Sequence, residues 1–172
     1  MKFIADGMLG KLTRWLRMLG QDVKYSKSLS DEQLIETTKT ENRILLTRDL
    51  KLYQRARKQG VDTALIEGAT KAEKLAGLAK RFNFKLEIDI TVSRCPKCNT
   101  PIKPVSKDKI LDKIPEATST HYEEFWECPS CGQIYWRGSH WKRIEKTFRE
   151  AKQALKSESV MCAPKEKIDE GT

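Results

Sequence analysis

The sequence predicts an α/β fold in which a parallel sheet flanked by helices is followed by a small four-cysteine module and a C-terminal helix. Two observations predict it. Short apolar runs alternate with helix-patterned segments through residues 1–90, and two Cys-x-x-Cys pairs follow within residues 95–131. Regular alternation of strands and helices is typical of parallel sheets. We therefore expect an α/β domain over 1–90, a metal module with a helix over 91–156, and a flexible tail over 157–172.

The first part is expected to hold four strands and four helices. Apolar residues recur at helical spacing in the segments between the apolar runs, and glycines such as Gly20 and Gly60 suit helix ends. Ser30 with Gln33 three residues later forms a capping box, which marks a helix start. The expected strands are 2–5, 23–25, 44–46 and 63–66, and the expected helices are 8–19, 30–40, 50–58 and 71–82.

The pattern changes after the fourth helix. Residues 86–92 alternate between apolar and polar side chains, which predicts a half-exposed strand. The cysteine module follows over 94–136, with an inserted helix at 107–113. Ser139 is expected to cap a last helix that ends near residue 156. The tail beyond it has mixed charge and little apolar content, and its single Cys162 is interpreted as an incidental thiol.

Composition bounds the class of protein. Hydrophobic residues make up 38% of the chain, which is enough for a core. The sequence has no run of about eighteen apolar residues, so it predicts no membrane-spanning helix. The N-terminus reaches Asp6 before any secretory apolar region. We therefore expect a cytoplasmic protein. Thiols stay reduced in that compartment, so paired cysteines indicate metal ligands rather than disulfides.

The net charge of +9 is concentrated in the two parts that we expect to fold. Residues 1–90 carry 18 basic and 12 acidic side chains (net +6), residues 91–156 carry 13 and 8 (net +5), and the tail carries 2 and 4 (net −2). A basic surface suits a polyanionic partner such as nucleic acid. A generic solubilising surface is the alternative explanation.

The cysteine pairs predict a structural zinc site formed by Cys95, Cys98, Cys128 and Cys131. Two residues between the cysteines of a pair allow both sulfurs to reach one ion, and four thiolates close a tetrahedron without a position for water. The 29 residues between the pairs leave room for a hairpin and an insertion. Redox dithiols and an iron–sulfur cluster are the alternatives.

Three acids stand where a catalytic metal would need them. Asp6 and Asp49 follow the first and third strands, and the carboxyl ends of parallel strands form the functional edge of such sheets. Asp31 begins the helix that Ser30 caps. Clustered carboxylates predict an oxygen-bound Mg²⁺ or Mn²⁺. The same residues also fit purely structural roles: Asp31 as a helix-dipole acid, Asp49 as an N-cap and Asp6 as a loop cap.

Basic and aromatic residues are candidates for substrate contacts. Phosphate contacts position a nucleic acid without reading its sequence, and aromatic rings stack on unpaired bases. A solvated helix face and the packing of the zinc module are the alternatives. The candidates are Lys11, Arg14 and Arg17 on the first helix, Arg48 beside Asp49, and Arg137 with His140 in the segment Tyr-Trp-Arg-Gly-Ser-His.

Several of these segments together resemble a known family. They are Phe-Ile-Ala-Asp-Gly-Met-Leu-Gly-Lys-Leu at 3–12, Arg-Trp-Leu-Arg at 14–17, Leu-Gly at 19–20, Leu-Thr-Arg-Asp at 46–49, the two cysteine pairs, and Tyr-Trp-Arg-Gly-Ser-His at 135–140. Over about residues 2–145 the sequence is similar to the Mut-seven C-terminal RNase domain family. That family has a PIN-like nuclease fold with a zinc ribbon.

The resemblance implies a metal-dependent endoribonuclease in which the zinc ribbon assists RNA binding. Asp6 matches the acid that ends the first strand of PIN domains, Asp31 matches their Asp-x-x-Leu pattern, and Asp49 matches their Thr-x-Asp pattern. PIN domains usually carry a further acid that has no clear match here, so three carboxylates favour one ion over two. The alternatives are a non-catalytic RNA-binding zinc-ribbon protein that acts on ribosomal or transfer RNA, and a DNA-binding ribbon.

Overall fold

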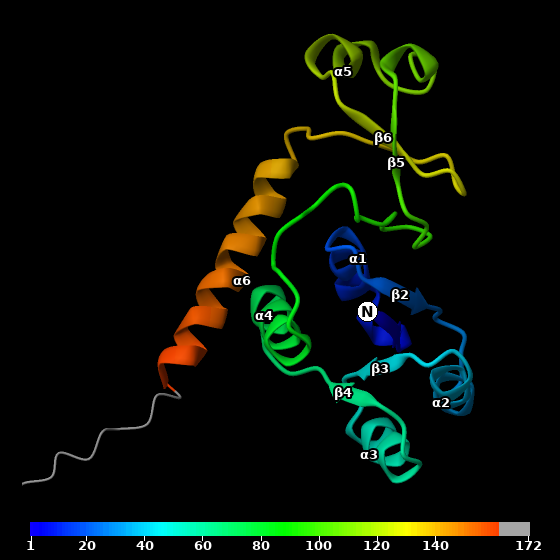
Figure 1. Ribbon diagram of the computed structural model, residues 1–172, viewed down its shortest axis with the longest axis vertical. Coiled ribbons are helices and arrows are strands. Elements are labelled where there is room, and N and C mark those ends of the chain that lie inside the picture. Colours follow the sequence, from blue (N-terminus) through cyan, green and yellow to red (C-terminus); the bar gives the residue numbers. More distant parts are fainter. Residues whose placement is uncertain (162–172) are drawn as a thin grey trace, which may run out of the picture.

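A four-stranded parallel sheet forms the centre of the first part of the molecule (Figure 1). In the computed structural model, which describes residues 1–161, the strand order is β2-β1-β3-β4. Ile4 of β1 lies beside Lys24 of β2 and Leu45 of β3. The α/β class with a parallel sheet flanked by helices is thus confirmed. The strands are β1 (Lys2–Ala5), β2 (Asp22–Tyr25), β3 (Ile44–Thr47) and β4 (Thr63–Leu65).

Helices cover both faces of this sheet. Phe3 packs in a cluster with residues of α1 and α4, whereas its neighbour Ile4 packs with residues of α2 and α3. Successive side chains of a strand point to opposite faces, so both residues are buried only in a three-layer arrangement. The helices are α1 (Gly10–Met18) with the short 3₁₀ turn η1 (Gly7–Leu9) before it, α2 (Asp31–Thr40), α3 (Leu50–Lys58) and α4 (Lys71–Phe82).

Local sequence signals set the helix ends. The predicted capping box is present at α2, where the Ser30 hydroxyl accepts from the Gln33 amide and the Gln33 side chain accepts from the Ser30 amide. Gly20 follows α1 with a left-handed φ of +80°, and a Cβ there would lie 3.0 Å from Val92. Glycine is therefore required at this turn both by its backbone and by its neighbour.

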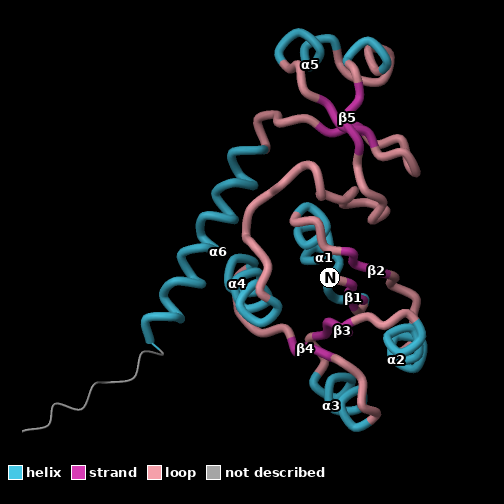
Figure 2. Tube along the Cα trace, in the orientation of Figure 1, coloured by secondary structure: helices cyan, strands magenta, loops and turns pink. Residues whose placement is uncertain are grey.

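A second, antiparallel sheet forms the cysteine module, which lies beyond the α1 end of the first sheet (Figure 2). Its order is β5-β6-β7, with β6 paired to both neighbours. The elements are β5 (Lys103–Val105), the 3₁₀ turn η2 (Lys107–Lys109), α5 (Glu116–His121), β6 (Phe125–Glu127) and β7 (Ile134–Tyr135).

Two predicted elements of this part are wrong. Residues 86–92 form no strand, because the Asp89 carboxylate accepts from the Thr91 amide and hydroxyl and turns the chain there. The apolar residues of the segment, such as Leu86, still pack on the core of the first part. The insertion is not a helix over 107–113. It consists of η2 and α5 separated by turns, since only Ile110 and Ile114 offer buried positions there.

The last helix, α6 (Trp141–Met161), lies along α4 (Figure 1). It completes the hydrophobic core that Phe3 forms with α1 and α4. Phe148 is buried in that core and meets the ring of Trp15 edge-on at 5.2 Å between centroids. α6 continues past residue 156, where we expected it to end, and the remaining tail with Cys162 lies outside the described residues. Over the described residues, no helix combines the length and apolar character needed to cross a membrane.

Candidate functional site: a carboxylate edge, a basic groove and a four-cysteine cluster

Asp6 connects the ends of β1 and β3. Its amide donates to the Leu46 carbonyl at 3.1 Å, and its side chain is 5% exposed. One carboxylate oxygen accepts from the Met8 amide at 2.8 Å, and the other accepts from the Thr47 hydroxyl and, at 3.3 Å, from the Arg48 amide. Asp6 therefore stands at the predicted functional edge, with both oxygens already bonded to the protein.

Thr47 links Asp6 to Asp49. Its hydroxyl donates to the Asp6 carboxylate and accepts from the Asp49 amide at 2.9 Å. Asp49 is the N-cap of α3, and its Oδ1 accepts from the amides of Lys51 and Leu52 at 2.7 and 3.1 Å. The structure thus joins two of the predicted acids through a buried threonine. The Thr-x-Asp pattern contained this residue, but sequence analysis assigned no role to its hydroxyl.

Asp31 is held by an arginine. Its carboxylate lies 3.2 Å from Nη2 of Arg55, and Nη1 of the same guanidinium lies 3.0 Å from the carboxylate of Glu32. Arg55 thus supplies the positive charge that sequence analysis assigned to a metal ion. The four sulfur atoms of the cysteine cluster all lie within 4.8 Å of each other. Within residues 1–161, this cluster is the one group of three or more possible ligands that could hold a metal ion. The three carboxylates therefore do not form a comparable group.

Oxygen chemistry at this edge suits Mg²⁺ or Mn²⁺. Mg²⁺ keeps several waters and is commonly bound through one or two carboxylates, so Asp6 and Asp49 are the residues that could hold it. Their present hydrogen bonds come from amides and a hydroxyl, which are weaker partners than a divalent cation. Asp31 is paired with Arg55, so it could serve as a ligand only after it leaves that arginine.

A basic groove of about 870 Å³ begins beside these acids. Gly7 and Arg48, the neighbours of Asp6 and Asp49, both line it. Its eight charged lining residues are all basic: Lys11, Arg14, Arg17, Lys27, Arg48, Lys71, Lys74 and Lys97. Low-dielectric walls around charges of one sign concentrate the field and attract polyanions. The groove is therefore a polyanion-binding surface that is lined by chain neighbours of Asp6 and Asp49 but not by these acids themselves.

Three of the predicted substrate residues, Lys11, Arg14 and Arg48, are exposed and line this groove. Gly10, the residue before Lys11, allows the start of α1 to approach Tyr25, because a Cβ on Gly10 would lie 2.5 Å from the Tyr25 hydroxyl. Arg17 also borders the groove but is only 5% exposed. All the hydrogen bonds of its guanidinium go to backbone carbonyls of Val23, Pro96 and Lys97, which gives it a structural role.

Arg137 and His140 lie outside this groove. The Arg137 guanidinium lies over the rings of Trp126 and Trp141, at 5.8 and 5.4 Å from their centroids, and His140 meets Trp136 edge-on. Arg137 instead borders a cavity of about 430 Å³ that also has acidic lining residues, among them Glu87. The positions of Arg137 and His140 therefore do not support their predicted contact with substrate.

The four cysteines gather as the sequence predicts. Sγ of Cys95 lies 3.6 Å from Sγ of Cys131, and Sγ of Cys98 lies 3.3 Å from Sγ of Cys128. A tetrahedral ion with 2.3 Å bonds to sulfur needs about 3.8 Å between sulfurs, so the cluster is close to ligand geometry. These four residues can bind a metal such as zinc.

The surroundings of the sulfurs support metal binding. Burial opposes ionisation at Cys98, but hydrogen bonds with Thr100 prevail and lower the pKa of its thiol to about 6. Burial raises the pKa of Cys128 to about 12. The Tyr135 hydroxyl lies 3.0 Å from the Cys95 sulfur and orients it. A divalent cation would stabilise the four sulfurs as thiolates, including that of the buried Cys128.

These features define an α/β domain with acids at the carboxyl edge of its parallel sheet and a four-cysteine module that can bind a metal. Residues 1–148 match the family described as Mut7-C RNAse domain, and the chain belongs to that family. Comparison with the curated proteins and with the solved structures gives no match. Family membership indicates a ribonuclease role and RNA as the substrate. The matched region includes both the carboxylate edge and all four cysteines.

Proposed function

We propose that this protein is a Mg²⁺- or Mn²⁺-dependent endoribonuclease that hydrolyses RNA phosphodiester bonds beside Asp6 and Asp49. One observation carries the proposal: the charged residues that line the groove are all basic, and Gly7 and Arg48, the chain neighbours of these two acids, are among its lining residues. Cations along the groove neutralise backbone phosphates without selecting a sequence.

In this proposal each group has a separate task. Asp6 and Asp49 hold the ion, and Asp31 joins them when it is released from Arg55. The ion, when bound, activates water and neutralises charge that develops on the phosphate. Lys11, Arg14 and Arg48 hold phosphates, and Thr47 fixes the two acids relative to each other.

The cysteine cluster holds structural zinc in this proposal and assists RNA binding through its module. Four thiolates leave no open position for chemistry at the ion. Free thiols that lie this close together suit a reducing compartment such as the cytoplasm.

Cleavage of a labelled RNA with single-stranded and hairpin segments tests the proposal. The wild type should cut with Mn²⁺ and stop cutting when EDTA is added. Asp6→Asn and Asp49→Asn should each reduce the rate at least about 100-fold, the scale of a lost electrostatic contribution to catalysis. Asp62→Asn is the matched control, because Asp62 is exposed and does not line the groove. The proposal fails if wild type never cuts or if both variants cut as fast as it does.

A non-catalytic RNA-binding protein is the second candidate. The ion pair of Asp31 with Arg55 favours it, as do the protein hydrogen bonds at both Asp6 oxygens. Such a protein would bind RNA with an affinity that depends on Lys11 and Arg14 but would leave it intact with Mn²⁺ or Mg²⁺. The same assay, followed by gel shift, distinguishes the two.

A further inference from the structure

We propose that the first cysteine knuckle, residues 95–99, forms one wall of the RNA groove and that Lys97 on it contacts a backbone phosphate. This inference rests on the proposed function, in which the groove binds RNA. It assigns the RNA contact of the module to this knuckle rather than to Arg137 and His140.

The knuckle lies at the groove. Pro96 and Lys97 line the groove together with residues of α1 and α4, and they are the members of the cysteine module that do so. Lys97 is exposed, and its ammonium donates to the side-chain oxygen of Gln133 at 3.2 Å. That acceptor is neutral, so this contact leaves the positive charge uncompensated. An exposed ammonium in a basic groove is a phosphate-binding group.

Arg17 fixes the knuckle to α1. Nη1 of Arg17 donates to the carbonyls of Pro96 and Lys97, each at 3.0 Å. Nε and Nη2 of the same guanidinium donate to the Val23 carbonyl at 3.0 and 2.7 Å. One buried side chain therefore connects α1, β2 and the knuckle, and its charge-assisted bonds hold the backbone of Lys97 in place.

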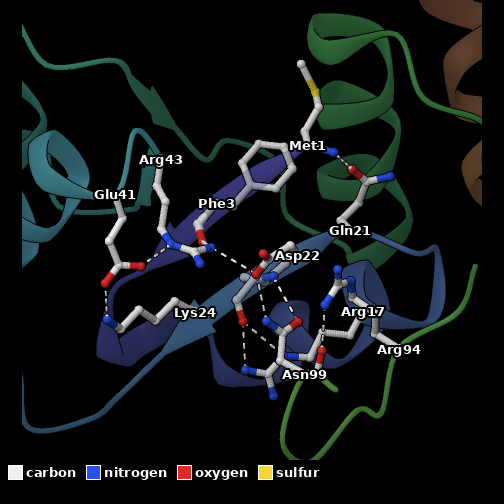
Figure 3. A network of polar contacts seen from close by, with 11 residues as sticks. Met1, Phe3, Arg17, Gln21, Asp22, Lys24, Glu41, Arg43, Arg94 and Asn99 are labelled. Carbon is white, nitrogen blue, oxygen red and sulfur yellow. Dashed lines mark hydrogen bonds and ion pairs between the residues drawn. The ribbon is translucent and has the colours of Figure 1, made fainter. Parts of the chain in front are cut away.

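The knuckle also contacts the edge of the sheet through Asn99 (Figure 3). Asn99 has a left-handed φ of 74°, and its side-chain oxygen accepts from the Val23 amide at 3.0 Å. Its side-chain amide donates to Asp22 at 2.7 Å, and Asp22 also pairs with Arg43 at 2.9 Å. The side chain of Asn99 thus bonds both the backbone and a side chain of edge strand β2. This contact and Arg17 are tertiary, so they set where Lys97 stands.

The groove fits a polymer better than a small anion. Its cations come from α1, α4, the segments after β2 and β3, and the knuckle, so they surround a space of about 870 Å³ instead of converging on one point. A chain of regularly spaced phosphates can contact several of these cations at once, and each contact adds to the salt dependence of binding.

RNA binding by single and double variants tests the proposal. The probe is a fluorescein-labelled single-stranded RNA, titrated without added Mg²⁺ or Mn²⁺ at several salt concentrations. Lys97→Ala should weaken binding about five- to tenfold at low salt and reduce the slope of log K against log salt by about 0.7, the value for one phosphate on a single strand. Lys103→Ala, an exposed lysine of the same module outside the groove, should change neither.

The positioning by Asn99 is tested in the same assay. Asn99→Ala removes a contact to β2 without removing a metal ligand, so it should keep one zinc per chain. In that background Lys97→Ala should weaken binding less than it does in the wild type, because the knuckle then keeps only its Arg17 contact and Lys97 stands less firmly at the groove. A full Lys97 effect in the Asn99→Ala background would overturn the positioning role.

Failure of this inference is distinct from failure of the proposed function. If wild type binds RNA and Lys11→Ala weakens binding while Lys97→Ala does not, the groove is the RNA site and the knuckle is not its wall. If wild type binds no RNA at all, the proposed function fails as well.

Discussion

The cysteine cluster and the carboxylate edge are both candidate metal sites, yet the structure prepares them differently. The four sulfurs already lie at nearly ligand distances and have few competing partners. The carboxylates instead accept hydrogen bonds from amides and Thr47, or pair with Arg55. A metal at the edge must displace these partners, whereas zinc at the cluster would bind four free thiols, two of them buried. We therefore expect tightly held zinc and a weakly held, exchangeable Mg²⁺ or Mn²⁺.

Removal of a buried cysteine should have the largest effect. Cys128→Ser should reduce zinc from one ion per chain to none and unfold the module, since binding of structural zinc contributes about 10 kcal/mol or more to folding. Metal analysis and circular dichroism measure this outcome. Cys162→Ser should retain the zinc and serves as the control. One zinc per chain in Cys128→Ser would show that the cluster is not a four-thiolate site.

Arg17 and Arg14 should differ although they lie one turn apart on α1. Arg17→Met leaves three backbone carbonyls without their donor and should lower the free energy of unfolding by about 3 kcal/mol. Arg14→Met should change it by less than about 0.5 kcal/mol but weaken RNA binding. Urea unfolding and RNA titration measure the two effects. Equal stability of the two variants would contradict the structural role of Arg17.

Substitution of Arg55 tests whether the ion pair between Arg55 and Asp31 weakens metal binding at the carboxylate edge. Arg55→Gln frees Asp31, so the Mn²⁺ concentration for half-maximal cleavage should fall several-fold. Stability should change by less than about 1 kcal/mol, because the pair is partly exposed. Arg57→Gln, exposed on the same helix, is the control. An unchanged Mn²⁺ requirement would remove Asp31 from the set of metal ligands.

Asp22 should give the smallest effect, which depends on pH. Burial opposes its ionisation, but hydrogen bonds from Arg43 and Asn99 hold the pKa of Asp22 below its ordinary value of 3.8. Its contribution to stability is therefore present above about pH 4 and is lost as the pH falls through the folded-state value. Asp22→Asn should lower the free energy of unfolding by about 1 kcal/mol at pH 7.

Urea unfolding between pH 7 and pH 3 checks this prediction. Zinc release in acid affects wild type and variant alike, so the difference between them isolates Asp22. That difference should shrink below about pH 4. A difference that is independent of pH would show that the carboxylate charge of Asp22 does not contribute.

Helices and strands that are marked by short sequence patterns could be predicted. A segment in which a side chain bonds to nearby groups and turns the chain could not. The capping box of Ser30 and Gln33 and the four strands of the first sheet follow from patterns a few residues long. The alternation over residues 86–92 also looks like a strand. Asp89 bonds to Thr91 two residues later and makes a turn, which the apolar pattern does not reveal.

The sequence by itself determined the ligand chemistry of this protein: two cysteine pairs with metal spacing, acids at strand ends, and a basic helix after the first of them. Only the tertiary structure decided which of these groups act together. Arg14 and Arg17 look alike in sequence, but packing buries one and leaves the other in the groove. Lys97 enters the groove because Arg17 and Asn99 fix the knuckle, and Asp31 meets Arg55 across two helices. Such contacts join residues that are far apart in the chain, so they depend on how the elements pack.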